Sequence, residues 1–256
     1  MCLSAAVICP LHAQQAQNRP YVDDKLFHFG FQLGLNFSSF SVTDSQVPVT
    51  YLNENGVEKT DTLHARVSGV LPGFHVGFVT DLRLSQHLNL RFCPGMQFTS
   101  RTLTYREKVI EGGEEVFKPV KSTYFASSVD VLAMPVYLPL YLKWSAEREG
   151  NYRPYVIAGG GVSFNVSRDK DKPVLLNLMD YFCEVGFGVD FYAKWFKFCP
   201  EITYRIGFAN QLCPLDQRED NFSQIKEGET TRNDFFYSNA ISRLTSHCVC
   251  LTFNFE

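Results

Sequence analysis

Ionisable side chains recur at even spacing within segments of this sequence that are otherwise apolar. Asp180, Glu184 and Asp190 lie among apolar residues at positions 179–193. Because side chains at even spacing on a β-strand share one face, the three carboxylates would lie on the same side of such a strand. Groups placed in this way could act in catalysis, line a conducting pore, or pair with opposite charges in a polar interior.

The positive and negative charges are distributed so that they can pair across such an interior. Most of the inward arginines come early in the chain, whereas the carboxylates come late. An unpaired buried charge is costly, so we expect these groups to form a structural network of ion pairs rather than a catalytic or conducting site. The predicted network comprises Arg83, Arg91, Arg101, Asp180, Glu184, Asp190, Glu201 and Arg205.

The positions of the histidines indicate whether the protein could instead be an enzyme. A hydrolase or transferase built on a small barrel needs a histidine, a serine and a carboxylate that converge near one rim. No histidine here forms a pair with a serine at strand spacing, with a carboxylate placed across from it. We therefore predict that the protein is not an enzyme and has no cofactor, metal site or small-molecule substrate. The six histidines are His12, His28, His64, His75, His87 and His247.

The segments that would carry these side chains alternate between apolar and polar residues. Residues 25–40 give the clearest example, because every odd position from Phe27 to Phe37 is Phe or Leu and the even positions are polar or Gly. One face of a soluble β-sandwich would show the same alternation. Later segments, however, carry Arg, Asp and Glu on the polar face in numbers that favour a barrel with lipid outside and a polar interior.

The number and spacing of these segments predict the architecture. Eight of them are found, and the connections between them alternate in length. The short connections are 84–87, 145–151 and 194–195, and the long polar ones are 41–71, 106–123, 168–177 and 209–240. Short turns at one end and long loops at the other are typical of outer-membrane barrels. The sequence therefore predicts an all-β protein, an eight-stranded antiparallel up-and-down transmembrane β-barrel.

Two segments depart from simple alternation. If Asp130 and the other even positions face the interior, the apolar residues at even positions after Ala133 would face inward too. A β-bulge near Ala133–Pro135 would shift the alternation by one position and turn these apolar residues outward. The run Gly159-Gly160-Gly161 is followed by neither Lys-Ser/Thr nor a helix, so we interpret it as a strand bend rather than a phosphate-binding loop. The strand count predicts an interior filled by side chains, closed to solutes.

The cysteines allow three interpretations. If the final hairpin pairs Phe208 near Ile241, Cys199 lies opposite Cys250 and both face inward. Directly opposed residues are slightly too far apart for an unstrained disulfide, so we expect two reduced thiols that pack as small apolar groups. A strained cross-strand disulfide comes second and a metal site third.

The ends of the sequence and its composition complete the domain assignment. Residues 1–16 have the short apolar core and small residues of a secretory signal peptide, although a disordered tail is the alternative. Residues 17–256 are then one outer-membrane barrel domain. The net charge of −3 and the lack of any Lys/Arg-rich run give no sign of a nucleic-acid partner.

Five segments in this order carry a family resemblance. They are FHFGFQLGLNFSSF at 27–40, PGFHVGFVTDLRLSQHLNLRFCPGMQF at 72–98, MPVYLPLYLKW at 134–144, RPYVIAGGGVSFNV at 153–166 and LTFNFE at 251–256. Together they resemble the PorT family of outer-membrane β-barrel proteins from the Bacteroidetes. The resemblance implies a non-enzymatic component in the cell outer membrane that is required for protein export by the type IX secretion system. Its partners would be membrane lipid and other components of that system, and export would support gliding or the display of surface proteases.

The resemblance supplies no catalytic motif, and it leaves a second interpretation open. The chain could be a surface adhesion or ligand-binding barrel that acts through its loops. The acidic, polar stretch at 216–234 would serve either function, although a charge-rich loop is most often simply a solvated one.

Overall fold

The computed structural model describes residues 17–122, 126–167, 174–213 and 236–256. The predicted signal peptide at 1–16 and the acidic stretch at 216–234 lie outside these described residues. Within the described part, no helix is long and apolar enough to cross a membrane.

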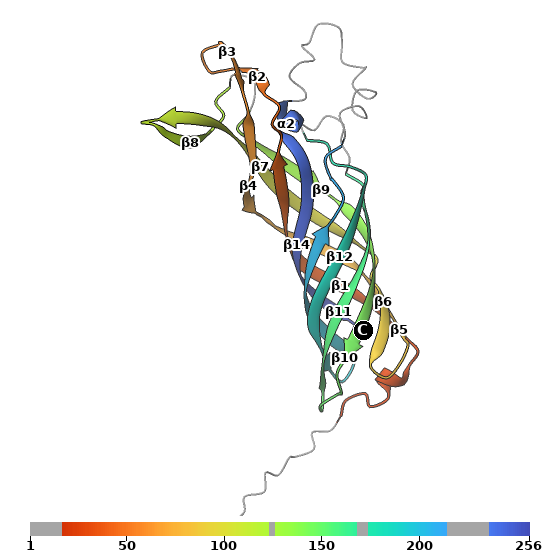
Figure 1. Cartoon of the computed structure of the whole chain (residues 1–256). Coiled ribbons are helices and arrows are strands. Elements are labelled where there is room, and N and C mark those ends of the chain that lie inside the picture. The colour runs from red at the N-terminus through yellow and green to blue at the C-terminus, as the bar shows by residue number, and fades with distance from the viewer. Residues whose placement is uncertain (1–16, 123–125, 168–173, 214–235) are drawn as a thin grey trace, which may run out of the picture.

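Eight antiparallel strands form a closed ring, which confirms the predicted barrel (Figure 1). Two of the eight are interrupted after Phe92 and at Met134, so each appears as two consecutive strands. Strand β1 closes the ring because it pairs with β5 on one side and with β14 on the other. In order around the ring, the strands are β1 (Phe27–Asp44), β5 (Pro72–Arg83), β6 (Leu88–Phe92) with β7 (Gly95–Glu111), β9 (Ser128–Ala133) with β10 (Pro135–Ser145), β11 (Tyr152–Asn165), β12 (Met179–Tyr192), β13 (Lys197–Gly207) and β14 (Ile241–Phe255).

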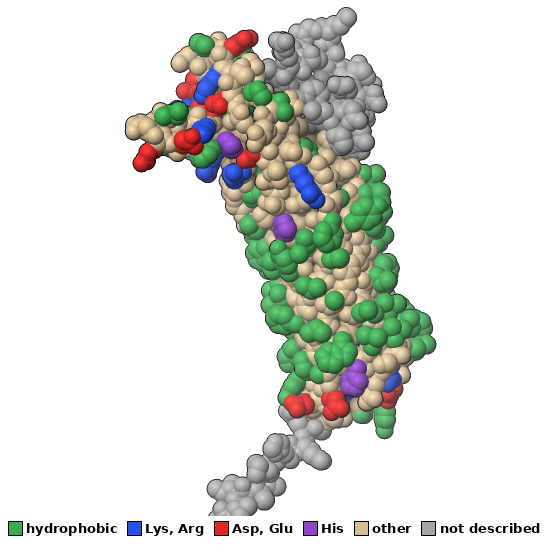
Figure 2. Space-filling view, viewed as in Figure 1, with side chains coloured by type: hydrophobic (Ala, Val, Ile, Leu, Met, Phe, Trp, Pro, Cys, Tyr) green, Lys and Arg blue, Asp and Glu red, His purple; other side chains and the backbone are tan. Residues whose placement is uncertain are grey.

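The outer surface of the ring is a broad apolar band (Figure 2). The outward side chains include Phe29, Phe78 and Phe187, which are 71, 69 and 60% exposed. Charged side chains gather beyond the two ends of the band instead. This is the distribution expected where hydrocarbon surrounds the middle of a barrel and water surrounds its ends.

Glycines make room for large aromatic side chains inside this narrow ring. A Cβ atom added to Gly159 would lie 2.9 Å from Cδ1 of Tyr141, and one added to Gly188 would lie 2.5 Å from Cζ of Tyr155. Strand β11 runs unbroken through Gly159 to Gly161, which remain in register with both neighbouring strands. The glycine run therefore permits close packing of an inward tyrosine, and it lies within a continuous strand rather than in a loop.

The predicted change of parity near Ala133–Pro135 is wrong. Val131 and Ala133 are buried, and so are the odd positions that follow, such as Tyr137 and Tyr141, so the strand keeps one parity across the break at Met134. Asp130 faces outward and accepts a hydrogen bond of 2.5 Å from the hydroxyl of Thr102. Its cross-strand partner on β7 is therefore a polar side chain that shares the same outward face.

Much of the long connections at 41–71 and 106–123 is folded rather than irregular. These residues extend the barrel wall into a head at one end, which Figure 1 shows tilted to the upper left. Leu63, Leu103, Tyr105 and Leu244 are completely buried there and belong to one apolar core that fills the upper interior. The head comprises β2 (Val49–Leu52), β3 (Glu58–Asp61), β4 (Leu63–Val70), β8 (Glu114–Pro119), α2 (Phe236–Asn239) and the adjoining ends of β1, β7, β9 and β14.

The opposite end carries the short connections, and we call it the turn end. A short 3-10 helix, η1 (Val22–Asp24), lies there with Val22 buried. His28 holds this segment through a 2.8 Å hydrogen bond between its Nε2 and the carbonyl of Val22. Arg148 adds hydrogen bonds from its guanidinium to the carbonyls of Asn18 and Arg19. The residues that precede β1 are therefore fastened across the turn end of the barrel.

The predicted register of the last hairpin is wrong by four positions. Cys199 lies opposite Asn254, not Cys250, and both thiols are buried. The reason is that β14 continues past the end of β13 and pairs there with β1, where Ile241 lies opposite Asp44. The neighbouring sulfurs are instead those of Cys248 and Cys250, 3.4 Å apart on one strand, and all six described cysteines are free.

Candidate functional site

The polar lumen of the turn half is built around Arg91 on β6. Asp81 on β5 lies directly opposite Arg91 in the sheet, and both side chains point inward. The guanidinium donates two hydrogen bonds to this carboxylate, Nε to Oδ1 at 2.6 Å and Nη2 to Oδ2 at 2.8 Å. Such bidentate pairs combine charge with fixed geometry, so they hold both side chains in one orientation.

Arg91 also joins strands from the other side of the ring. Its Nη1 lies 3.1 Å from Oε2 of Glu201 on β13, and its Nη2 lies 2.8 Å from Oε1 of Glu256, the residue after β14. The hydroxyl of Tyr155 donates a second hydrogen bond of 2.8 Å to Glu201. One buried cation therefore connects three carboxylates across the lumen.

Two lysines complete this network. Nζ of Lys143 lies 2.8 Å from both carboxylate oxygens of Asp190 and 3.9 Å from Oδ2 of Asp81. Lys197 forms an ion pair with Glu256 and lies 3.9 Å from Asp190. All of these side chains are almost completely buried. The network, which we call the lower charge network, connects β5, β6, β10, β12, β13 and the end of β14.

A second ion pair lies nearer the middle of the barrel. Nε of Arg205 donates to Oε2 of Glu184 at 2.8 Å, and the hydroxyl of Tyr141 donates to the same oxygen at 2.8 Å. Nη1 of Arg205 donates to the amide oxygen of Gln97 at 3.0 Å. His75 completes this level through a contact of 3.1 Å between its Nε2 and the hydroxyl of Thr252.

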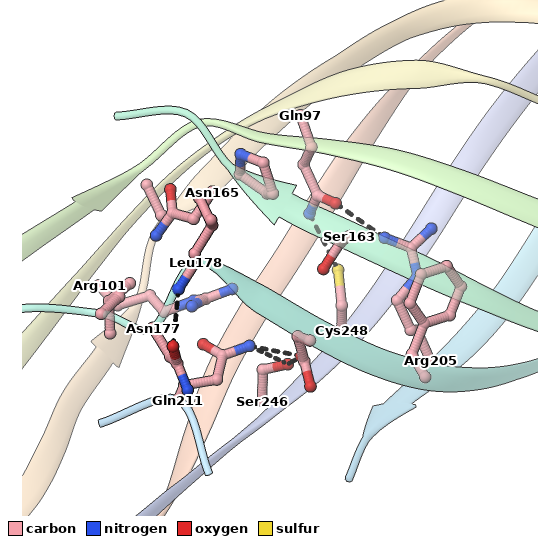
Figure 3. A pocket seen from close by; sticks show the side chains of 15 residues that line it. Gln97, Arg101, Ser163, Asn165, Asn177, Leu178, Arg205, Gln211, Ser246 and Cys248 are labelled. Atoms are coloured by element: carbon pink, nitrogen blue, oxygen red, sulfur yellow. Dashed lines mark hydrogen bonds between the residues drawn. The ribbon is translucent and has the colours of Figure 1, made fainter. Parts of the chain in front are cut away.

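The structure places the eight predicted residues in three different settings. Arg91, Glu184, Asp190, Glu201 and Arg205 take part in buried ion pairs. Arg101 (Figure 3) and Asp180 line a cavity near the head, and neither has an ion-pair partner among the described residues. Arg83 lies at the rim of the turn end, where its Nη1 is 3.1 Å from Oδ1 of the exposed Asp24.

Four members of the lower charge network are absent from the predicted set. Lys143 follows a long apolar run, yet it shares the odd parity of the inward Tyr137 and Tyr141, and that spacing was the available signal. Glu256 follows the last outward residue, Phe255, and therefore has inward parity. Asp81 and Lys197 also have inward parity and belong to the network.

This arrangement leaves little free space inside the barrel. The cavity near the head has a volume of about 40 Å³, and the one beside Arg205 and Cys250 about 10 Å³. A buried water needs roughly 10–15 Å³ measured in this way, so these spaces have room for only a few waters or small ions. Among the described residues, no group of three or more His, Cys, Asp or Glu side chains is placed to hold a metal ion.

The geometry corresponds to a barrel with an ionic interior and an apolar outer band, and the comparison with known families agrees. No curated protein matches this chain. The model of one family, described as outer membrane protein beta-barrel domain, matches residues 15–212, which is more than half of the sequence. The chain belongs to this family of outer-membrane β-barrel proteins.

Proposed function

We propose that the protein is a closed, non-enzymatic barrel of the outer membrane that is required for protein export through the type IX secretion system. The observation that carries the proposal is the blocked lumen. The lower charge network fills the turn half, and an apolar core fills the head half. A barrel closed in this way works through its surfaces, by contact with partner proteins, rather than through its bore.

The two ends offer different surfaces for such contacts. In outer-membrane barrels the short turns face the periplasm and the long connections face outward, so the head would be extracellular. The turn end is charged, with Asp23, Arg148 and Arg153 around a cavity of about 250 Å³. We propose that other components of the secretion system bind at one of these ends. The export role itself rests on the sequence resemblance to the PorT family.

Gene deletion tests this proposal. The deletion strain should retain exported proteins that bear the type IX C-terminal signal, and the medium and cell surface should lose them. Reintroduction of the wild-type gene should restore export. A control cargo secreted by another route should be unaffected in both strains. Normal export of the type IX cargo in the deletion strain would contradict the proposal.

The head favours a second candidate, a surface adhesion or ligand-binding barrel. The ribbon of β7 and β8 projects from the body (Figure 1), and Ile110 and Phe117 on it are 73 and 46% exposed. Exposed apolar side chains on a projecting ribbon are suited to binding another molecule. The same deletion strain separates the two candidates, because normal export combined with lost adhesion would favour this one.

A further inference from the structure

The cavity near the head lies where the character of the barrel interior changes. On the turn side its wall contains Gln97 and Arg205, which belong to the middle ion pair. On the head side the interior becomes apolar at Phe40 and Leu103. Arg101 lies at this boundary, and Figure 3 shows it among the side chains that surround the cavity.

Arg101 is a buried cation without a counterion among the residues that the structure describes. Its side chain is 5% exposed, and its guanidinium carbon lies 4.2 Å from the centre of the Phe40 ring. Within the described part of the chain, its Nε has no hydrogen-bond partner and no carboxylate lies within ion-pair distance. Stacking on an aromatic ring offsets only part of the cost of burying a charge. The guanidinium therefore has unused donors beside an open space.

The other charged groups of the cavity wall do not neutralise Arg101. Arg205 is already paired with Glu184. Asp180 accepts hydrogen bonds from the amide of Gln211 at 2.6 Å, the hydroxyl of Ser246 at 3.2 Å and the main-chain N–H of Ala209 at 3.2 Å. With its oxygens occupied in this way, Asp180 stays out of ion-pair contact with Arg101.

We propose that this cavity binds one small inorganic anion, of the size of a halide, which Arg101 holds through its guanidinium. The volume of about 40 Å³ admits such an ion with a water and excludes sugars, nucleotides and phosphate esters. A second unpaired atom, Oδ1 of Asn165, is an acceptor in the same wall and would take a hydrogen bond from that water. The bound anion is then the counterion of Arg101, which has no carboxylate partner among the described residues.

Heat unfolding of the purified full-length protein in detergent micelles tests the site. A ligand that binds only the folded state raises the unfolding midpoint in proportion to the logarithm of its concentration once the site fills. We expect sodium chloride or sodium bromide to raise the midpoint relative to sodium gluconate at equal ionic strength, because gluconate is too large for the cavity. Equal midpoints in halide and gluconate would overturn the proposal.

Two variants show where the halide acts. Arg101→Met keeps most of the side-chain volume and removes the charge, so it should abolish the difference between halide and gluconate. Arg83→Met removes an arginine at the rim and should retain the difference. If both variants respond as the wild type does, the ion binds elsewhere and the proposal fails.

A crystal of the wild-type protein grown in sodium bromide gives a readout that does not depend on the variants. The anomalous signal should place a bromide within hydrogen-bond distance of the Arg101 guanidinium. A cavity that contains only water at this position, without anomalous signal, would overturn the proposal even if Arg101→Met fails to fold.

Discussion

Arg91 and Asp81 face each other across two adjacent strands and form a bidentate ion pair inside the barrel, at 2.6 and 2.8 Å. The pair has no contact with bulk water, since both side chains are at most 1% exposed. Removal of one partner from such a pair leaves the other as an uncompensated buried charge. The pair is therefore the most sensitive point of the lower charge network.

The first prediction follows from this pair. Arg91→Met should lower the free energy of unfolding by about 3–5 kcal/mol, because Asp81, Glu201 and Glu256 lose their shared cation. Denaturant unfolding in micelles measures the change. Arg83→Met is the matched control, and it should cost at most about 1 kcal/mol because its partner Asp24 is exposed. Equal losses in the two variants would show that the network contributes no special stability.

The second prediction concerns the apolar band. Phe187→Arg should destabilise the inserted barrel by about 2–4 kcal/mol, because an outward arginine near the middle of the membrane meets hydrocarbon. Ile110→Arg is the control, since Ile110 is even more exposed (73%) but lies on the head. It should be nearly neutral. Unfolding from lipid vesicles measures both, and a neutral Phe187→Arg would contradict the position of the band.

The third prediction is the pH dependence of the head. Burial raises the pKa of Glu107, but the hydrogen bonds that Lys59 and Tyr51 donate to it outweigh burial and leave that pKa lowered. A lowered carboxyl pKa stabilises the folded head above the usual glutamate range, and this stability is lost as the pH falls through the folded pKa. The hydrogen bond to Glu107 raises the pKa of Lys59, so the lysine contribution is complete below its usual range and is lost only at still higher pH.

Hydrogen exchange in β2 and β3 measures this dependence. Protection should be steady around neutral pH and should fall only at a pH below the usual glutamate range, as Glu107 becomes protonated. Glu107→Gln should remove most of that acid transition while the barrel remains folded. An unchanged acid transition in Glu107→Gln would assign it to other groups.

The fourth prediction concerns the thiols. Cys93, Cys183, Cys199, Cys213, Cys248 and Cys250 are free, so protein denatured without reductant should give six reactive thiols from these positions. In the folded protein, a membrane-soluble maleimide should label Cys183 first, because it is the exposed one and faces the apolar band. A deficit traced to Cys248 and Cys250 would indicate that this neighbouring pair is oxidised.

The alternation of residues predicted the strands and their faces, but it could not predict the register of the last hairpin. A shift by an even number of positions leaves every side chain on the same face, so the pattern is identical with Cys199 opposite Cys250 or opposite Asn254. Beyond the end of β13, β14 continues to pair with β1, and that contact joins residues about two hundred positions apart, such as Asp44 and Ile241.

The candidate site was predictable only in part for a related reason. Parity places a charged residue on a face, but it does not tell how far along the barrel axis the residue lies. Arg83 and Arg91 share a parity, yet one lies at the rim and the other in the centre of the network. Asp130 has outward parity and lies opposite the polar Thr102, from whose hydroxyl it accepts a hydrogen bond. The partner of each charge depends on height in the barrel, and the strand tilt that sets this height is not visible in the pattern.

Conductance in planar lipid bilayers tests most directly the central claim that the barrel is closed. The lower charge network and the apolar core of the head both block the bore, so the purified wild-type protein should show no stable ohmic steps. An eight-stranded outer-membrane protein with an equally packed interior is the negative control, and a porin is the positive one. Stable ohmic conductance comparable with that of the porin would contradict the claim.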